Sequence, residues 1–150
     1  MIRELPFQLS KGFFLERRQV LLPWNSKVKQ LFYIGTPDAI ERTGTVFLDW
    51  RYDRCLDGLP ATVHAQLRRS QKFREVQLMT CLPQIDFTAH VNFERVNKHL
   101  ISIFGEPDRI STIMDFPIYE WIGEQLEISH FIFERFGEYC VLKIRRKGPV

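Results

Sequence analysis

The residue types that most often carry catalysis or bind metals are few in this chain and lie far apart. The 150 residues include four histidines and three cysteines, which are His64, His90, His99, His130, Cys55, Cys81 and Cys140. None of them falls into an HExxH, a CxxC or a similar spacing, which metal sites and disulfide frameworks usually show. His130 stands near Glu127 and Glu134, yet we expect it to be a strand residue paired with a neighbour. The sequence therefore predicts no metal site.

Motifs for a catalytic nucleophile or a bound nucleotide are also missing from the sequence. A reactive cysteine needs a neighbour that lowers its thiol pKa, and nothing beside the three cysteines suggests one. The glycines stand singly, as at Gly12 and Gly44, without the spacing of a phosphate-binding loop or a nucleophile elbow. We therefore expect no cofactor and favour a non-enzymatic protein, while a hydrolase whose site no motif reveals stays open as an alternative.

Composition and charge are those of an ordinary globular domain. The chain is 45% hydrophobic and 26% charged, contains 13 phenylalanines, and has a net charge of +3. We expect a cytoplasmic protein, because no apolar run approaches about 18 residues and the cysteines form no disulfide framework. The most basic stretch is residues 68–74, where Arg68, Arg69, Lys72 and Arg74 offer an alternative function in binding nucleic acid or an anionic ligand. We expect a protein partner rather than a nucleic-acid partner, since dedicated nucleic-acid binders are more strongly basic than this chain.

The sequence predicts a helix near residues 93–104, and the residues that follow are of types that end helices. Val96, Leu100 and Phe104 give it an apolar stripe, and Asn92 is its expected N-cap. Gly105-Glu106-Pro107-Asp108 follows, and Gly35-Thr36-Pro37-Asp38 ends a similar predicted helix about seventy positions earlier. In both places glycine can adopt the left-handed conformation that closes a helix. We expect Asp38 and Asp108 to bond to the turn backbone rather than to act as an acid and base pair.

Alternation of apolar and polar residues predicts the strands. Strands are expected at residues 45–52, 61–67, 75–80, 118–121, 126–134 and 139–145. Trp50 and Trp121 each fall in the first predicted strand after a Gly-x-Pro-Asp element. The fold class predicted is therefore α+β, a tandem repeat of a helix packed on antiparallel β-strands. We expect one domain made of two diverged repeats, approximately residues 1–70 and 71–150.

A helix closed by Gly-x-Pro-Asp, followed by antiparallel strands and then repeated, resembles the modules of β-lactamase inhibitory protein and of small outer-membrane-assembly lipoproteins. It also resembles small immunity proteins carried beside bacterial toxins. The resemblance covers most of the chain in pattern, with Gly-x-Pro-Asp as its specific motif, and no inhibitory residue can be carried over. The chain starts with neither a lipoprotein signal nor a cysteine, which argues against the lipoprotein branch. The resemblance implies a protein-binding protein, most concretely an immunity or inhibitor protein acting against a bacterial toxin.

The predicted partner-binding surface is the face of the sheet opposite the helices. Its residues are Phe47, Arg51, His64, Phe131 and Phe133, with Asp49 and Gln66 beside them. Phenylalanines among charged residues are typical of an interface with an apolar centre and a polar rim. The alternative, weighted equally, is that Phe131 and Phe133 are buried by the other half of the chain. Because the chain is mildly basic, we expect a target other than a nuclease held through its DNA-binding groove.

Overall fold

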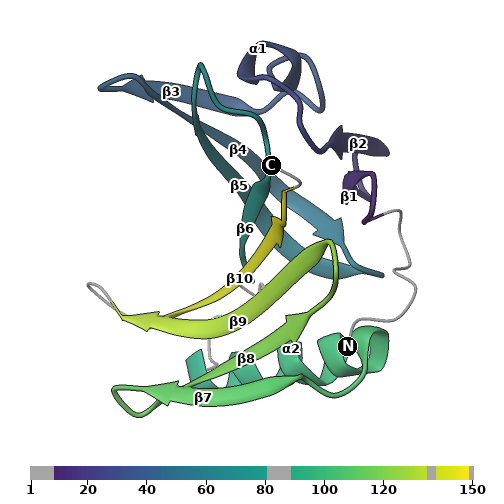
Figure 1. The fold of residues 1–150 in the computed structure, drawn as a ribbon, viewed down its shortest axis with the longest axis vertical. Coiled ribbons are helices and arrows are strands. Elements are labelled where there is room, and N and C mark those ends of the chain that lie inside the picture. Colours follow the sequence, from purple (N-terminus) through teal and green to yellow (C-terminus); the bar gives the residue numbers. More distant parts are fainter. Residues whose placement is uncertain (1–8, 81–88, 135–137, 149–150) are drawn as a thin grey trace.

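The computed structural model describes residues 9–80, 89–134 and 138–148. Within these ranges the chain forms ten strands and two helices (Figure 1). The helices are α1 (Val28–Leu31) and α2 (Ala89–Phe104). The strands are β1 (Gly12–Leu15), β2 (Val20–Pro23), β3 (Asp38–Arg42), β4 (Thr45–Cys55), β5 (Leu59–Arg68), β6 (Glu75–Met79), β7 (Arg109–Ile113), β8 (Phe116–Ile122), β9 (Leu126–Glu134) and β10 (Glu138–Arg146). No helix in these ranges is long and apolar enough to cross a membrane.

Eight of the strands form one antiparallel sheet. Their order is β3-β4-β5-β6-β10-β9-β8-β7, and β1 pairs with β2 in a separate two-stranded sheet. The two central strands, β6 and β10, pair antiparallel, with Leu78 of β6 opposite Leu142 of β10. Figure 1 shows β3 and β7 at opposite ends of the curved sheet. The antiparallel sheet that the sequence predicts is therefore confirmed.

One face of the sheet, which we call the inner face, carries the hydrophobic core. Side chains alternate between the two faces of a strand, so every second residue points into the core. The inner-face residues Leu48, Trp50, Val63, Leu78, Trp121, Ile128 and Leu142 are all buried. The hairpin of β1 and β2 adds Phe13, Leu15 and Leu22 to this core, and α2 adds Val96, Leu100 and Phe104. All but one of the core residues that the sequence predicts are buried, and Phe32 is half-buried. The predicted core residues are Leu31, Phe32, Trp50, Val63, Leu100, Phe104, Trp121, Ile128 and Leu142.

The predicted fold class is wrong. The fold is mainly β, with one large eight-stranded sheet and only one helix longer than a single turn among the described residues, rather than a tandem repeat of a helix packed on strands. The first predicted helix is reduced to the four residues of α1. After Leu31 the backbone N–H groups of Tyr33 and Ile34 donate three residues back, to the carbonyls of Gln30 (3.2 Å) and Leu31 (3.1 Å), so the i→i−4 pattern of an α-helix ends. Gly35 and Thr36 follow with positive φ angles.

The strand content is also higher than the sequence suggested. Residues 38–42 and 109–113, where the sequence predicts no strand, form the two edge strands β3 and β7. The helix α2 begins at Ala89, so Asn92 lies inside it and is not its N-cap. Edge strands are short and exposed, which weakens the alternating pattern from which strands are predicted.

The two Gly-x-Pro-Asp elements are turns that lead into edge strands. Gly35 has a φ of +68° and Gly105 a φ of +82°, the left-handed geometry that the sequence predicts. The indole Nε1 of Trp50 donates a hydrogen bond to the carbonyl of Ile34 (2.8 Å), and that of Trp121 donates to the carbonyl of Gly105 (2.8 Å). Each turn is therefore tied to a buried tryptophan, while the division into repeats at residues 1–70 and 71–150 stays a prediction.

A β-bulge in β4 interrupts its alternation and sets the position of Arg51. The register with β5 shifts between Trp50 and Asp53, and Tyr52 has a φ of +55°. The buried carboxylate of Asp53 accepts hydrogen bonds from the backbone N–H of Arg17 (2.8 Å) and from Nη1 of Arg18 (2.7 Å). These bonds tie the turn between β1 and β2 to the bulge.

The burial of Leu100 in the core predicts how much stability the protein loses when this side chain is shortened. This residue is fully buried in the middle of α2, so Leu100→Ala should lower the free energy of unfolding by about 2 to 5 kcal/mol through lost burial and the cavity that remains. Denaturant melts measure the change. Lys98→Ala, on the exposed side of the same helix, should change it by less than about 0.5 kcal/mol. Equal effects of the two substitutions would show that α2 does not pack on the sheet through Leu100.

Candidate functional site

The outer face of the sheet, opposite the core, carries the five residues predicted to bind a partner. Phe47 lies on β4, His64 on β5, and Phe131 and Phe133 on β9. Phe131 is half-buried and the side chain of Phe133 is 46% exposed, so the alternative that the other half of the chain buries both is wrong. Arg51 is exposed, and its Nε lies 3.1 Å from a carboxylate oxygen of Asp38 on the neighbouring edge strand.

A polar hollow of about 200 Å³ surrounds Phe47 and His64. Asp49 and His64 are opposite each other in the register of β4 and β5, and Nδ1 of the imidazole contacts the carboxylate. Gln66, Glu75, Gln77, Met79 and Ala65 complete the lining. This hollow therefore combines one aromatic ring with carboxylates and amides.

An apolar hollow of about 600 Å³ surrounds Phe131 and Phe133. It begins at the β7 edge of the sheet and extends over β8 to β9. The residues that line it are Ile113, Met114, Phe116, Ile118, Phe131, Ile132 and Phe133, with Glu120 and Ser129 as its polar members. The side chain of Met114 is 87% exposed and that of Ile113 is 61% exposed. Large apolar side chains are thus held open to solvent around a concave surface.

The structure does not bring the five predicted residues into one pocket. Two strands, β6 and β10, lie between β5 and β9, which separates His64 from Phe131 by roughly 15 Å at about 4.8 Å per strand. Charged pairs occupy this middle ground. Nζ of Lys143 lies 3.7 Å from a carboxylate oxygen of Glu75, and Arg145 pairs with Glu127. The outer face therefore has an apolar region and a polar region, and the ion pairs lie between them.

The Asp49–His64 pair is the arrangement in this region closest to catalytic chemistry. A carboxylate at Nδ1 orients an imidazole so that Nε2 could take a proton from a nucleophile. Among the described residues, the lining of the polar hollow includes no serine, threonine, cysteine or lysine. A base role of this pair would therefore act on water or on a group that a ligand supplies.

The other titratable candidates that the structure describes bond or pack within the fold. Among the described residues no three histidine, cysteine or acidic side chains come together as metal ligands. Cys55 and Cys140 are buried, and burial raises the pKa of the Cys55 thiol well above its usual value, which makes it a poor nucleophile. Cys81 lies outside the described residues. His99 contacts the carbonyl of Leu56 through Nε2 (2.6 Å).

His130 is a strand residue, as predicted, but its partner comes from α2. Its Nδ1 lies 2.7 Å from Oδ1 of Asn97, and its ring stacks on Phe93 with centroids 4.3 Å apart. The side chain is fully buried on the inner face, and Nε2 has no partner among the described residues. The site therefore favours a neutral ring, and burial lowers the pKa of His130 to about 3.

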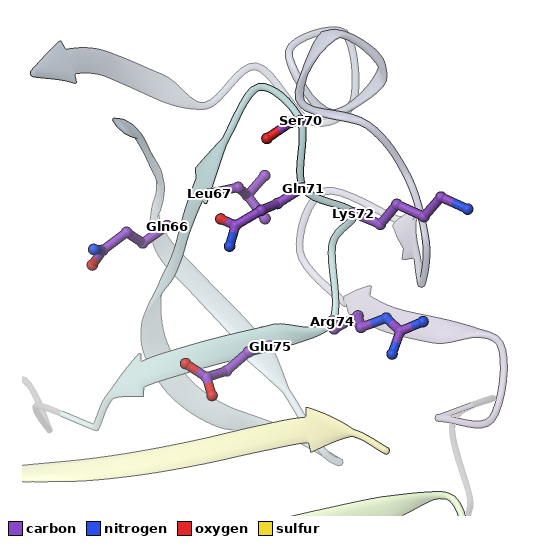
Figure 2. A pocket seen from close by; sticks show the side chains of 7 residues that line it. All are labelled: Gln66, Leu67, Ser70, Gln71, Lys72, Arg74 and Glu75. Atoms are coloured by element: carbon purple, nitrogen blue, oxygen red, sulfur yellow. The ribbon is translucent and has the colours of Figure 1, made fainter. Parts of the chain in front are cut away.

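The basic segment at residues 68–74 forms a loop around a third hollow, of about 550 Å³, but it does not focus positive charge there. Arg69 is bound to both carboxylate oxygens of Glu41, and Phe73 is buried against Trp24. Figure 2 shows Lys72 and Arg74 extending to one side of the loop, while Gln66 and Glu75 extend to the other. Arg69 is therefore held by Glu41, while Lys72 and Arg74 extend together to the side of the loop opposite Gln66 and Glu75.

The two repeated aspartates lie at opposite edges of the sheet and cannot form an acid and base pair. Oδ2 of Asp108 accepts a hydrogen bond from the backbone N–H of Ile122 (2.7 Å), and this bond lowers the pKa of the carboxyl group. Asp38 begins β3 and pairs with Arg51. Asp108 thus bonds to the backbone of β8, and Asp38 bonds to a side chain, rather than to the turn backbone that the sequence predicts.

Sequence reasoning missed most of the apolar hollow. Ile113, Met114, Phe116 and Ile118 were not expected at the surface. One signal was available, since residues 116–122 place apolar side chains at both even and odd positions, which indicates a strand with apolar residues on both faces.

Comparison with protein-family models, with curated proteins and with solved structures found no match to this chain. The resemblance to β-lactamase inhibitory protein and to small immunity proteins therefore stays an expectation from the sequence.

Burial of His130 predicts how stability depends on pH. The ring binds a proton near pH 6.5 in the unfolded chain but only near pH 3 in the folded protein, so protonation favours unfolding. Stability should be unaffected by this group above pH 6.5 and should fall as the pH decreases below it, at up to about 1.4 kcal/mol per pH unit. Urea melts between pH 8 and pH 4 measure the slope.

His130→Gln is the matched variant, because its amide can still bond to Asn97 but cannot titrate. The variant should lose less stability than the wild type between pH 6.5 and pH 4. Parallel loss in the two proteins would show that His130 is not held neutral in the core.

Proposed function

We propose that this chain is a non-enzymatic protein-binding protein whose partner docks on the outer face of the sheet. The observation that carries the proposal is the apolar hollow, around which the side chains of Ile113, Met114 and Phe133 stay 61%, 87% and 46% exposed. Monomeric proteins rarely expose such groups together unless the patch binds something. The most concrete version is an immunity or inhibitor protein acting against a bacterial toxin, as the sequence resemblance implies.

The chemistry of the outer face supports a protein partner. Aromatic residues and methionine are enriched at the centres of protein interfaces, and charged residues at their rims. Here the rim is supplied by ion pairs, including Arg109 with Glu120 (2.8 Å) on the β7 side of the hollow. A large apolar side chain of the partner would fill the hollow as an anchor, while the polar hollow at Phe47 and His64 would lie toward the rim.

The competing functions have less support. A hydrolase would need a nucleophile or a metal beside the Asp49–His64 pair, and the hollow around that pair provides neither from its lining. A nucleic-acid site would need converging cations, whereas Arg69 is neutralised by Glu41 and both cations of the central outer face, Lys143 and Arg145, pair with glutamates.

The test is capture of a partner from a lysate of the native host, followed by identification and binding with the two purified proteins. Phe133→Ala should weaken binding at least tenfold, since truncating an anchor residue typically costs about 2 kcal/mol or more. Its melting temperature should change little, because Phe133 is 46% exposed. Tyr33→Ala is the matched control, an 84% exposed aromatic residue next to α1 and away from the outer face.

Phe47→Ala, Arg51→Ala and His64→Ala then map how far the interface extends from the hollow. Unchanged affinity in Phe133→Ala and Phe131→Ala, with weakened binding in Tyr33→Ala, would contradict the proposed surface. Turnover in a substrate screen that His64→Ala abolishes would contradict the non-enzymatic function.

A further inference from the structure

The two edges of the eight-stranded sheet differ in how they are protected. An edge strand exposes unpaired backbone N–H and C=O groups, and natural sheets block them with charged side chains. β3 carries Asp38, Glu41 and Arg42 among its five residues. Arg51 binds Asp38 and Arg69 binds Glu41, so two guanidinium groups lie along this edge. β3 is thus protected against the addition of a further strand.

β7 lacks this protection. Its sequence is Arg-Ile-Ser-Thr-Ile, and its single charge, Arg109, is held by both carboxylate oxygens of Glu120. Among the described strands β7 has one neighbour, β8. Ile110 is 58% exposed and Ile113 is 61% exposed, and they lie on opposite faces of the strand. Apolar side chains therefore flank the open edge on both sides.

We propose that β7 pairs antiparallel with β7 of a second copy of this chain. A register centred on Ser111 pairs all five residues, with Ser111 opposite Ser111, Ile110 opposite Thr112, and Arg109 opposite Ile113. This arrangement has two-fold symmetry, so each copy supplies the same surface to the other. The two sheets then form one continuous sheet across the pair.

The side chains of β7 fit a second copy of the same strand. β-Branched residues occupy three of its five positions, and small hydroxyl side chains meet at the centre. No like charges face each other in this register, because the only charged residue, Arg109, is opposite an isoleucine. Since Arg109 is already neutralised by Glu120, it adds no unpaired charge to the interface.

The pairing also has a consequence for the outer face. The apolar hollow begins at Ile113 and Met114, beside this edge, so the hollows of two paired copies would lie on the same face, on either side of the symmetry axis. The edge and the hollow share Ile113, but the backbone of β7 makes the proposed pairing, so self-pairing does not depend on the proposed function.

Sedimentation velocity of the purified full chain tests self-pairing directly. The wild type should shift from one to two copies of the 17.9 kDa chain as its concentration is raised toward about 1 mM, as a small interface of modest affinity requires. Ser111→Lys and Ser111→Glu should each weaken dimerisation at least tenfold, because like charges then face each other across the axis. An equimolar mixture of the two variants should restore dimers.

Ile40→Lys on β3 is the matched control, since Ile40 is 54% exposed and faces outward as Ile113 does. It should leave dimerisation unchanged, whereas Ile113→Lys should weaken it. Circular dichroism and melting temperature confirm that each variant folds. A wild type that stays monomeric up to about 1 mM would overturn the proposal. So would dimers that Ile40→Lys abolishes, or a failure of the Ser111→Lys and Ser111→Glu mixture to form dimers.

Discussion

An eight-stranded sheet has two faces, and the described elements of this protein cover only one of them with a hydrophobic core. The hairpin of β1 and β2 and the helix α2 fill the inner face with buried residues such as Phe13, Leu22 and Leu100. At about 25 cal/mol per Å² of buried apolar surface, this one-sided burial is the main source of stability. It leaves the outer face open to solvent, where the apolar hollow lies.

The outer face is not uniformly polar, as a purely solvent-facing sheet surface would be. Its middle strands, β6 and β10, carry matched charges such as Glu75 with Lys143, which suit contact with water. Toward β7, isoleucine, methionine and phenylalanine side chains replace them around the apolar hollow. A protein that only needed to fold would gain little from these exposed groups, since they add nothing to the core. Their concentration at one end of one face is the observation that supports the proposed protein partner.

The sequence predicted the core and the six central strands because alternation is strong where one face is buried. Trp50, Val63, Trp121 and Leu142 lie where their period of two placed them. The fold class was missed because the helix expected before Gly35 is a single turn, and because β3 and β7 are short edge strands whose exposed residues show little alternation. The candidate site was predicted only in part. The alternation of β9 predicts that Phe131 and Phe133 share one face. Ile113 and Met114 lie near them because β7, β8 and β9 are neighbours in the sheet, and no local sequence pattern encodes that order.

Hydroxyl-radical footprinting read by mass spectrometry tests the central claim most directly, because it reports the accessibility of single side chains in the free protein and in a complex. In the free protein, Met114 and Phe133 should react readily, as exposed residues do, while the buried Phe73 should be protected. In a complex with a captured partner, Met114 and Phe133 should become protected and Tyr33 should not. Protection of Met114 and Phe133 already in the free monomer, or protection in the complex at Tyr33 alone, would contradict the account.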